Sequence, residues 1–319
     1  MSRYVVRRVL LAIPTLLMIS LVLYAILSLA PGDPLSQFAA NPAVPPEVRD
    51  NIRRSLGLDQ PWPVRYVKWL IALAHGDWGF SFGSRIPVWD LIKLRIPSTL
   101  AVVGVAYLCS LVIALPIGIL SAVKQYSIFD HIATTFAFIG FSVPTFFTGL
   151  LLIIVLSVKL GWLPFIYDST LQVHDLSTLG SQVKQSIMPI TVLALFQTAT
   201  FVRYTRASML ENMPQDYVRT ARAKGLAEAG VIGRHVLRNS LIPVVTLIAL
   251  SAPTVFSGAL ITEQIFRVPG IGSLLITSIQ NNDIPVIMAI TFTFSTLIVL
   301  FNMLADVMYG FLDPRIRYD

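Results

Sequence analysis

Charge is what this chain has least of. Only 13% of its 319 residues are charged, which is about half of the ~25% that is typical of soluble domains. Six windows contain no Asp, Glu, Lys or Arg: residues 9–32, 96–123, 132–158, 185–202, 239–262 and 284–305. Each reaches or nearly reaches the roughly 20 residues with which a helix crosses a bilayer while satisfying its own backbone hydrogen bonds. The absence of charge therefore excludes a soluble protein.

This pattern predicts an all-α integral membrane protein with one transmembrane domain over residues 1–319. Six helices are expected at about 9–31, 96–123, 132–158, 185–207, 239–262 and 284–310. The first could be a cleaved signal peptide, but its apolar run exceeds the 7–15 residues of a signal core, so we interpret it as a retained helix. Gly140, Pro144 and Gly149 predict a kink or close packing in the third helix.

Residues that could bind a metal or a nucleotide are also scarce. Cys109 is the only cysteine, and the four histidines show no ligand spacing. Gly225 and Gly230 imitate the start of a phosphate loop, but Val231 and Ile232 stand where Lys and Ser or Thr would be required. We therefore expect no metal, cofactor or nucleotide site in this chain. The uncharged helices also argue against a proton-coupled or ion-coupled transporter, whose relay needs an ionisable group within the membrane.

Positive charge is distributed unevenly among the loops. Lys and Arg gather before the first helix, between the fourth and fifth, and after the sixth, whereas the two shorter loops on the other side hold only Lys159, Lys184 and Arg267. The positive-inside rule predicts that both termini and a loop at about 208–238 are cytoplasmic, and that a long segment at about 35–95 lies outside. The net charge of +7 follows from this topology, so no nucleic-acid partner is indicated.

The long outer segment has two stretches with apolar residues at helical spacing. They are Val48, Ile52 and Leu56, followed by Val64, Val67, Trp69 and Leu70. This spacing predicts short amphipathic helices on or near the outer face. Two interpretations remain open: a cap over the bundle, and a docking surface for an external partner.

The most basic stretch is "DYVRTARAKGLAEAGVIGRHVLRNSLIPVV", residues 216–245. Asp216 is a suitable N-cap for a helix that starts at Tyr217, Arg222 and Lys224 suit its last turn, and Gly225 suits a left-handed C-terminal residue. A topology signal, a lipid-headgroup patch and a rigid knob for a cytoplasmic partner are three possible interpretations. The knob is favoured, because it alone accounts for a compact helix that ends at a glycine.

Two further sets of residues could bear on transport. Gln197, Thr198 and Thr200 lie at membrane depth in the fourth helix, where polar side chains either bond to another helix or line a path. Both alternatives stay open, and the first is preferred. After the fifth helix, Pro269, Gly270 and Gly272 predict a tight turn.

The motifs, taken in order, resemble a known family along nearly the whole chain. They include "RRVLLAIPTLLMI", "PGDP", "LGLDQP", "GDWGFSF", "SRIPVWDLI", "IFDH", "DYVRTARAKGL", "RHVLRNSLIPVVT", "TEQIFRVPGIGSLL" and "DPRIR". The chain resembles the B-type permease subunit of dipeptide and oligopeptide importers, which are binding-protein-dependent ABC transporters. It departs from the wider superfamily, in which a Glu-Ala-Ala triplet occupies the positions of Arg219, Thr220 and Ala221 and a proline occupies that of Arg238.

The resemblance implies a type I importer permease in the bacterial cytoplasmic membrane. Its partners would be a homologous second permease, two ATPase subunits that bind ATP and Mg²⁺, an extracytoplasmic substrate-binding protein and the lipid bilayer. The loop helix would be a coupling helix seated in an ATPase groove, through Tyr217, Thr220, Ala221, Lys224, Gly225 and Leu226. An outer gate would involve Glu263, Pro269, Gly270 and Gly272.

Alternatives in other classes are a stand-alone secondary transporter or channel, whose basic loop is only a topology signal, and a membrane scaffold with no transported substrate. Within the importer branch, the substrate could be a dipeptide, a longer peptide, glutathione or a chelated metal.

Overall fold

The structure, a computed structural model, describes residues 2–29, 47, 54, 57, 59–171, 173–257 and 259–312. Within these residues the fold is almost entirely helical, and the only β pairing is a single bridge between Phe80 and Pro87. Five helical segments are long and apolar enough to cross a membrane: Val6–Leu29, Val88–Val123, Leu176–Asn212, Glu228–Phe256 and Ile284–Ala305. A sixth is a broken pair, Ile128–Ser142 with Thr145–Lys159. The expected all-α membrane fold is confirmed.

Helices in the first half of the chain lie as follows. They are α1 (Ser2–Leu29), α4 (Trp62–Ala74), α5 (Val88–Thr99), η1 (Leu100–Gly104), α6 (Val105–Val123), α7 (Ile128–Ser142), α8 (Thr145–Leu152) and η2 (Ile153–Lys159). Here α5, a wider π-helical turn η1 and α6 form one continuous span, and α8 continues directly into the π-helical η2.

The second half begins with the longest helix, α9 (Leu176–Asn212). It continues with α10 (Asp216–Ala223), α11 (Glu228–Gly230), η3 (Val231–Val236), α12 (Leu237–Ser251), α13 (Pro253–Ser257), α14 (Leu260–Phe266), α15 (Ile271–Gln280) and α16 (Ile284–Leu312). At 1.5 Å per residue, α9 is roughly 55 Å long, well beyond the ~30 Å of a hydrocarbon core.

Several helices extend past the boundaries expected from the uncharged windows. The second span begins at Val88, inside the segment expected at 35–95, and the fifth begins at Glu228, inside the loop expected at 208–238. A window without charged residues shows only which part of a helix can lie in hydrocarbon. The helix itself continues into water where packing against other elements stabilises it. The first amphipathic stretch of the outer segment (Val48, Ile52 and Leu56) lies outside the described residues, whereas the second forms α4.

Two of the expected helices are broken. The third, expected at 132–158, bends by 100° between α7 and α8, because Val143 and Pro144 adopt extended backbone angles and a residue before proline is disfavoured in the helical region. The fifth, expected at 239–262, is divided into α12, α13 and the start of α14, with Ala259 outside helical geometry. The kink expected near Pro144 is confirmed.

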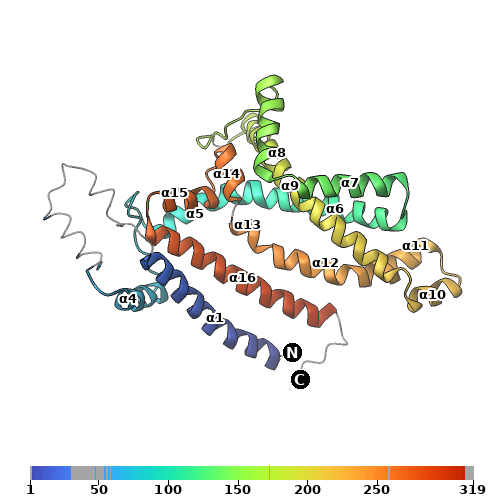
Figure 1. Ribbon diagram of the computed structural model, residues 1–319, viewed down its shortest axis with the longest axis horizontal. Coiled ribbons are helices and arrows are strands. Elements are labelled where there is room, and N and C mark those ends of the chain that lie inside the picture. Colours follow the sequence, from blue (N-terminus) through green and yellow to red (C-terminus); the bar gives the residue numbers. More distant parts are fainter. Residues whose placement is uncertain are drawn as a thin grey trace.

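Helix α9 organises the bundle by packing against α6, α7, α8 and α12, while α1 and α4 pack together and α1 also lies against α16 (Figure 1). Its Phe201 is fully buried among side chains that include Tyr107 and Ala199. The close packing of α6 against α9 also needs glycine at position 118 of α6. A Cβ there would lie 2.7 Å from Cβ of Thr205 in α9. Figure 1 shows α10 and α11 at one end of the bundle and α4, α5 and α15 at the opposite end.

Candidate functional site: a seated loop helix and a buried glutamate turn

The loop helix α10 is a compact element with defined ends. It starts at Asp216 after Gln215, whose backbone is extended, so Gln215 rather than Asp216 occupies the N-cap position. Asp216 instead places its carboxylate in the first turn, which suits the positive end of the helix dipole. Beyond Ala223 and Lys224 the chain turns at Gly225, which has a φ of +76°. The left-handed conformation expected for this glycine is confirmed.

An ion pair closes the elbow that follows α10. Arg222 donates from Nε to one carboxylate oxygen of Glu228 at 3.1 Å and from Nη2 to the other at 2.7 Å. This two-point contact joins the last turn of α10 to the first residue of α11. Both side chains are substantially exposed to water, where ion pairs contribute little to the stability of the fold. The pair therefore mainly fixes the angle between α10 and α11.

One face of α10 is seated on the bundle itself. Val218 and Ala221 are 0% and 4% exposed, and they belong to an apolar cluster with Ala122, Met209, Val231 and Val236. Ala221 therefore faces the chain's own core, and its expected part in an ATPase contact stays a prediction. The small side chain lets α10 lie close to the ends of the spans. Val231 is fully buried in the same cluster.

The opposite face of α10 is open to solvent. Tyr217 and Thr220 of the expected coupling residues are exposed on this face, and the other exposed ones, Lys224, Gly225 and Leu226, follow in the turn after the helix. Tyr217 is held in place because its hydroxyl donates to Oδ1 of Asn212 at 2.7 Å. The arrangement is a rigid projecting helix with a mixed apolar and basic surface, which suits docking into a groove of a partner.

A polar network at the same end was missed by the sequence analysis. Asp130, 2% exposed at the start of α7, accepts two bonds from Arg206 of α9, with Nε–Oδ1 2.7 Å and Nη2–Oδ2 2.8 Å. It also accepts bonds from the Ser121 hydroxyl and the Tyr126 backbone N–H. The network ties three helices together beside the seat of α10. An acid placed just before an uncharged window, with arginines after another such window, was the available signal.

The turn at the other end is built around one carboxylate. Glu263 of α14 is 0% exposed. Its Oε1 accepts from the Thr99 hydroxyl at 3.1 Å, and its Oε2 accepts from Ser273 N–H at 2.9 Å. The same Thr99 oxygen accepts from Ile271 N–H at 2.8 Å. Burial raises the pKa of the Glu263 carboxyl, and the Ser273 N–H acts against that rise.

Close packing, rather than turn chemistry, explains the two glycines of this segment. Gly270 has an extended backbone with φ −98°, but a Cβ there would lie 2.3 Å from Oε1 of Glu263. A Cβ at Gly272 would lie 3.0 Å from Oε2. The expected turn is present, yet its left-handed residue is Arg267 at φ +54°. The structure thus brings Glu263, Gly270 and Gly272 together.

Within the part of the chain that the structure describes, the three polar residues of α9 make no bond to another helix. Gln197, Thr198 and Thr200 are all partly exposed, and Thr200 bonds only to the carbonyl of Phe196 in its own helix at 3.4 Å. Among the described residues, the preferred interpretation of interhelix bonding therefore finds no support.

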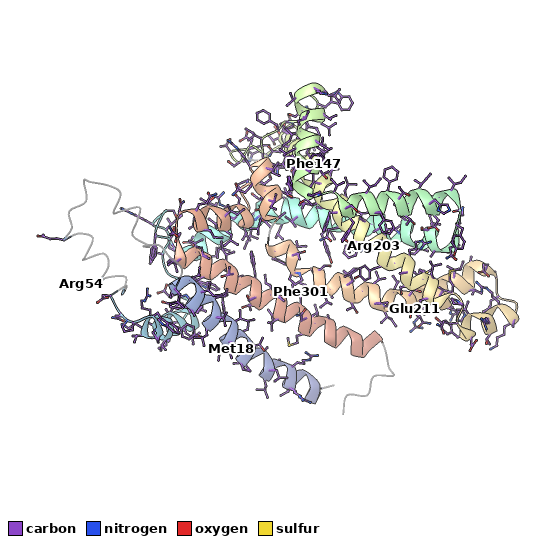
Figure 2. The ribbon with its side chains drawn as sticks, viewed as in Figure 1. Met18, Arg54, Phe147, Arg203, Glu211 and Phe301 are labelled. Carbon is purple, nitrogen blue, oxygen red and sulfur yellow. The ribbon has the colours of Figure 1, made fainter. Side chains whose placement is uncertain are left out.

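Arg203, labelled in Figure 2, lies over the ring of Phe141 at 4.4 Å from its centre, one turn nearer the α10 end of α9.

Known proteins are similar to this chain along its whole length. Residues 114–318 match the family described as "Binding-protein-dependent transport system inner membrane component", and residues 1–103 match the corresponding N-terminal family. The oligopeptide transport system permease protein AppB of Bacillus subtilis is 41% identical over 322 residues, covering 100% of both chains. The dipeptide transport system permease protein DppB of Escherichia coli K12 is 39% identical over 337 residues, covering 100% of this chain and 99% of the relative.

A third relative, the di/tripeptide transport system permease protein DppB of Pseudomonas aeruginosa, is 37% identical over 334 residues, again across 100% of this chain and 99% of the relative. These matches confirm the resemblance to B-type permeases that the motifs indicated, and they favour a permease component over a stand-alone transporter. Together with the apolar spans, they indicate a multi-pass protein of the inner membrane. The chain belongs to the family of inner membrane components of binding-protein-dependent transport systems, as the permease component of an importer.

Proposed function

We propose that this chain forms half of a translocation path for peptides, and that partner ATPase subunits drive it by hydrolysing ATP. The peptide substrate is supported by the names of three relatives that cover nearly the whole chain. The other half of the path would come from a homologous permease, and an extracytoplasmic binding protein would deliver the peptide. Gln197, Thr198 and Thr200 are our candidates for lining the path, because their side chains are partly exposed and make no bond to another helix among the described residues.

The observation that carries this proposal is the two-sided nature of α10. Its Val218 and Ala221 are buried in the chain's own core, while Tyr217 of the helix and Lys224 and Leu226 of the turn after it are exposed. A helix held so firmly on one face transmits a force applied to the other face. We infer that α10 is the coupling helix, that it lies in a groove of a cytoplasmic ATPase, and that ATP and Mg²⁺ bind to that partner.

The test is affinity purification of the tagged full chain in mild detergent from cells that express the whole system. We expect two ATPase subunits to co-purify, and the paired change Tyr217→Ala with Leu226→Ala to reduce their recovery strongly at equal membrane abundance. Ile128→Ala is a matched control, because Ile128 is 79% exposed at the start of α7, outside α10. Equal ATPase recovery from the double variant and the control would refute the coupling role. Saturable ATP binding by the isolated chain would refute the partner assignment.

The orientation is tested by labelling. With both termini and α10 in the cytoplasm, a cysteine at exposed Asp59 should react with a membrane-impermeant thiol reagent in intact cells, in a Cys109→Ala background. A cysteine at exposed Ala227 should react only after the cells are opened. The reverse pattern would invert the proposed topology.

We further propose that the turn around Glu263, with Pro269, Gly270 and Gly272, belongs to an outer gate. The support is geometric, since Glu263 bonds α14 both to the N-terminal end of α15 and to Thr99 at the end of α5. If one of these three helices shifts, either its hydrogen bond to Glu263 breaks or the other two helices move with it.

A further inference from the structure

A cavity of about 840 Å³ lies at the end of the bundle opposite α10. Its walls are α1, α4, the turn between α4 and α5, and the first residues of α16. Ser28 is next to the last residue of α1, and Ile284 is the first residue of α16. The cavity is therefore level with the ends of two spans, at the depth where lipid headgroups lie. Its volume falls within the ~300–1,000 Å³ of small-molecule sites.

Helix α4 forms one wall because its aromatic side chains attach it to α1. The Tyr66 hydroxyl lies 2.9 Å from the Ser20 hydroxyl of α1. Trp69 packs between Tyr24 of α1 and Phe292 of α16, with ring centres 6.0 Å and 5.8 Å away. Such amphipathic rings favour the boundary between hydrocarbon and headgroups.

The cavity is positively charged. Arg65, Lys68 and Arg85 line it together with one carboxylate, Asp77. A second carboxylate nearby, Asp283, is already engaged, because it accepts bonds from the Ser81 hydroxyl and from the N–H groups of Phe82 and Gly83. Arg85 already takes part in an interaction of its own, so the positive charge open to a ligand comes from Arg65 and Lys68, of which Asp77 offsets one.

Among the residues described here, two buried polar atoms in the lining have no hydrogen-bond partner. Nε of Arg65 and Oε1 of Gln60 are buried and make no hydrogen bond within the part of the chain that the structure describes. An unbonded buried donor or acceptor is destabilising. A ligand that offers an oxygen acceptor to Arg65 and a hydroxyl donor to Gln60 would satisfy both atoms.

The outer surface of α4 shows what kind of molecule carries such a ligand. Val64, Val67 and Ile71 are 45%, 52% and 54% exposed and share one helix face at spacings of three and four residues. Arg65 and Lys68 lie beside this apolar stripe. An apolar stripe next to a row of cations is typical of a helix that lies in the membrane interface and attracts acidic lipids.

We propose that this cavity binds the headgroup of an anionic phospholipid of the phosphatidylglycerol type. The phosphate accepts bonds from Arg65 and Lys68, a headgroup hydroxyl donates to Gln60, and the acyl chains lie along the apolar stripe of α4. The bound lipid thereby fixes α4 against α1 and α16. The proposal does not depend on which side of the membrane this end faces.

The test compares lipid retention by the assembled full-length protein in nanodiscs that contain equal amounts of phosphatidylglycerol and phosphatidylcholine. After extraction and mass spectrometry, the wild type should retain phosphatidylglycerol preferentially. Arg65→Gln with Lys68→Gln should reduce that retention at least tenfold, because the loss of even one charge-assisted hydrogen bond has an effect of about that size. Lys159→Gln is the matched control, because Lys159 is an exposed cation outside the cavity. Equal retention in wild type and double variant would overturn the proposal.

A second measurement does not rely on the charged variants. Brominated phosphatidylglycerol should quench tryptophan emission more than brominated phosphatidylcholine does. That excess should fall in Trp69→Phe and persist in Trp162→Phe, a tryptophan outside the cavity. If no excess quenching is seen, the lipid site is refuted. Displacement of phosphatidylglycerol by inorganic phosphate, or by a short peptide through its carboxylate, would assign the cavity to a soluble anion and would likewise overturn the lipid.

Discussion

Gly225 and Gly270 stand at opposite ends of the bundle, and the chain uses glycine there for different reasons. Gly225 has a φ of +76°, and a Cβ added to it would meet nothing within 4 Å. Gly270 has an ordinary extended φ, but an added Cβ would lie 2.3 Å from a buried carboxylate oxygen. The first glycine is required by backbone conformation and the second by the space available.

This difference matches what each end is proposed to do. At Gly225 the chain turns in the open, which leaves the surface of α10 free for a partner. At Gly270 the chain closes tightly over Glu263, which leaves no room for water around the carboxylate. The contrast teaches that the role of a glycine, at the exposed turn of Gly225 or in the buried contact of Gly270 with Glu263, is decided by its surroundings and not by the residue type.

The largest effect is expected from Gly270→Val. The added side chain overlaps the Glu263 carboxylate, and overpacking of a buried site typically destabilises by about 1–3 kcal/mol. We expect uptake to be lost and the unfolding temperature to fall, while ATPase recovery is retained because α10 is at the other end. Gly180→Val is the control, since a Cβ at Gly180 meets nothing within 4 Å. Normal uptake by the Gly270 variant would refute the proposal that the turn around Glu263 belongs to an outer gate.

Ala221→Glu should have an effect of similar size, but on ATPase recovery and at the α10 end of the bundle only. A carboxylate at a position that is 4% exposed within an apolar cluster is strongly unfavourable, so α10 should leave its seat while the spans stay folded. ATPase recovery should fall, and trypsin should cleave faster after the exposed basic residues of α10. Thr220→Glu, on the exposed face, should leave the trypsin rate unchanged. Equal cleavage in both variants would show that Ala221 does not seat the helix.

Gly225→Val should have an intermediate effect. A β-branched residue in the left-handed region costs ~1–2 kcal/mol, with no added clash, so ATPase recovery and uptake should fall only in part. Gly225→Asn should be milder still, because Asn tolerates this conformation. At position 270 Asn should be as harmful as Val, which separates the two reasons for glycine. Equal effects of Asn and Val at 225 would contradict the assignment to backbone conformation.

The smallest effect is a change in pH dependence at Glu263. Burial raises the pKa of its carboxyl above the ordinary value of 4.5. The folded protein therefore holds this proton more tightly than the unfolded chain. Its contribution to stability is fully present below about pH 4.5 and is lost as the pH rises through the folded-state pKa. Glu263→Gln should flatten this decline in unfolding temperature, whereas Glu211→Gln, an exposed carboxylate on α9 (Figure 2), should leave it unchanged. A wild-type slope in the Glu263→Gln variant would assign the decline to another group.

Much of the fold followed from composition and local pattern. The uncharged windows identified the spans, since hydrocarbon excludes unpaired charge whatever the helix contacts. The left-handed Gly225 was also predictable, because a helix terminator depends on its immediate neighbours. Local pattern failed where a contact joined distant residues. Asp130 and Arg206 are 76 positions apart, and Glu263 bonds to Thr99 across 164 positions. The burial of Ala221 against Ala122 and Met209, which lie far from it along the chain, was hidden for the same reason.

By itself, the sequence determined that this chain lies in a membrane, which segments are apolar enough to cross it, and that one short basic helix follows the longest of them. These features depend on hydropathy, charge and local turn chemistry, which act over a few neighbouring residues. Tertiary structure alone decided which face of α10 is buried, why Gly270 has no side chain, and that α4, α1 and α16 enclose a basic cavity. Each of these depends on the close approach of side chains far apart along the chain, and packing selects such contacts only when the helices assemble.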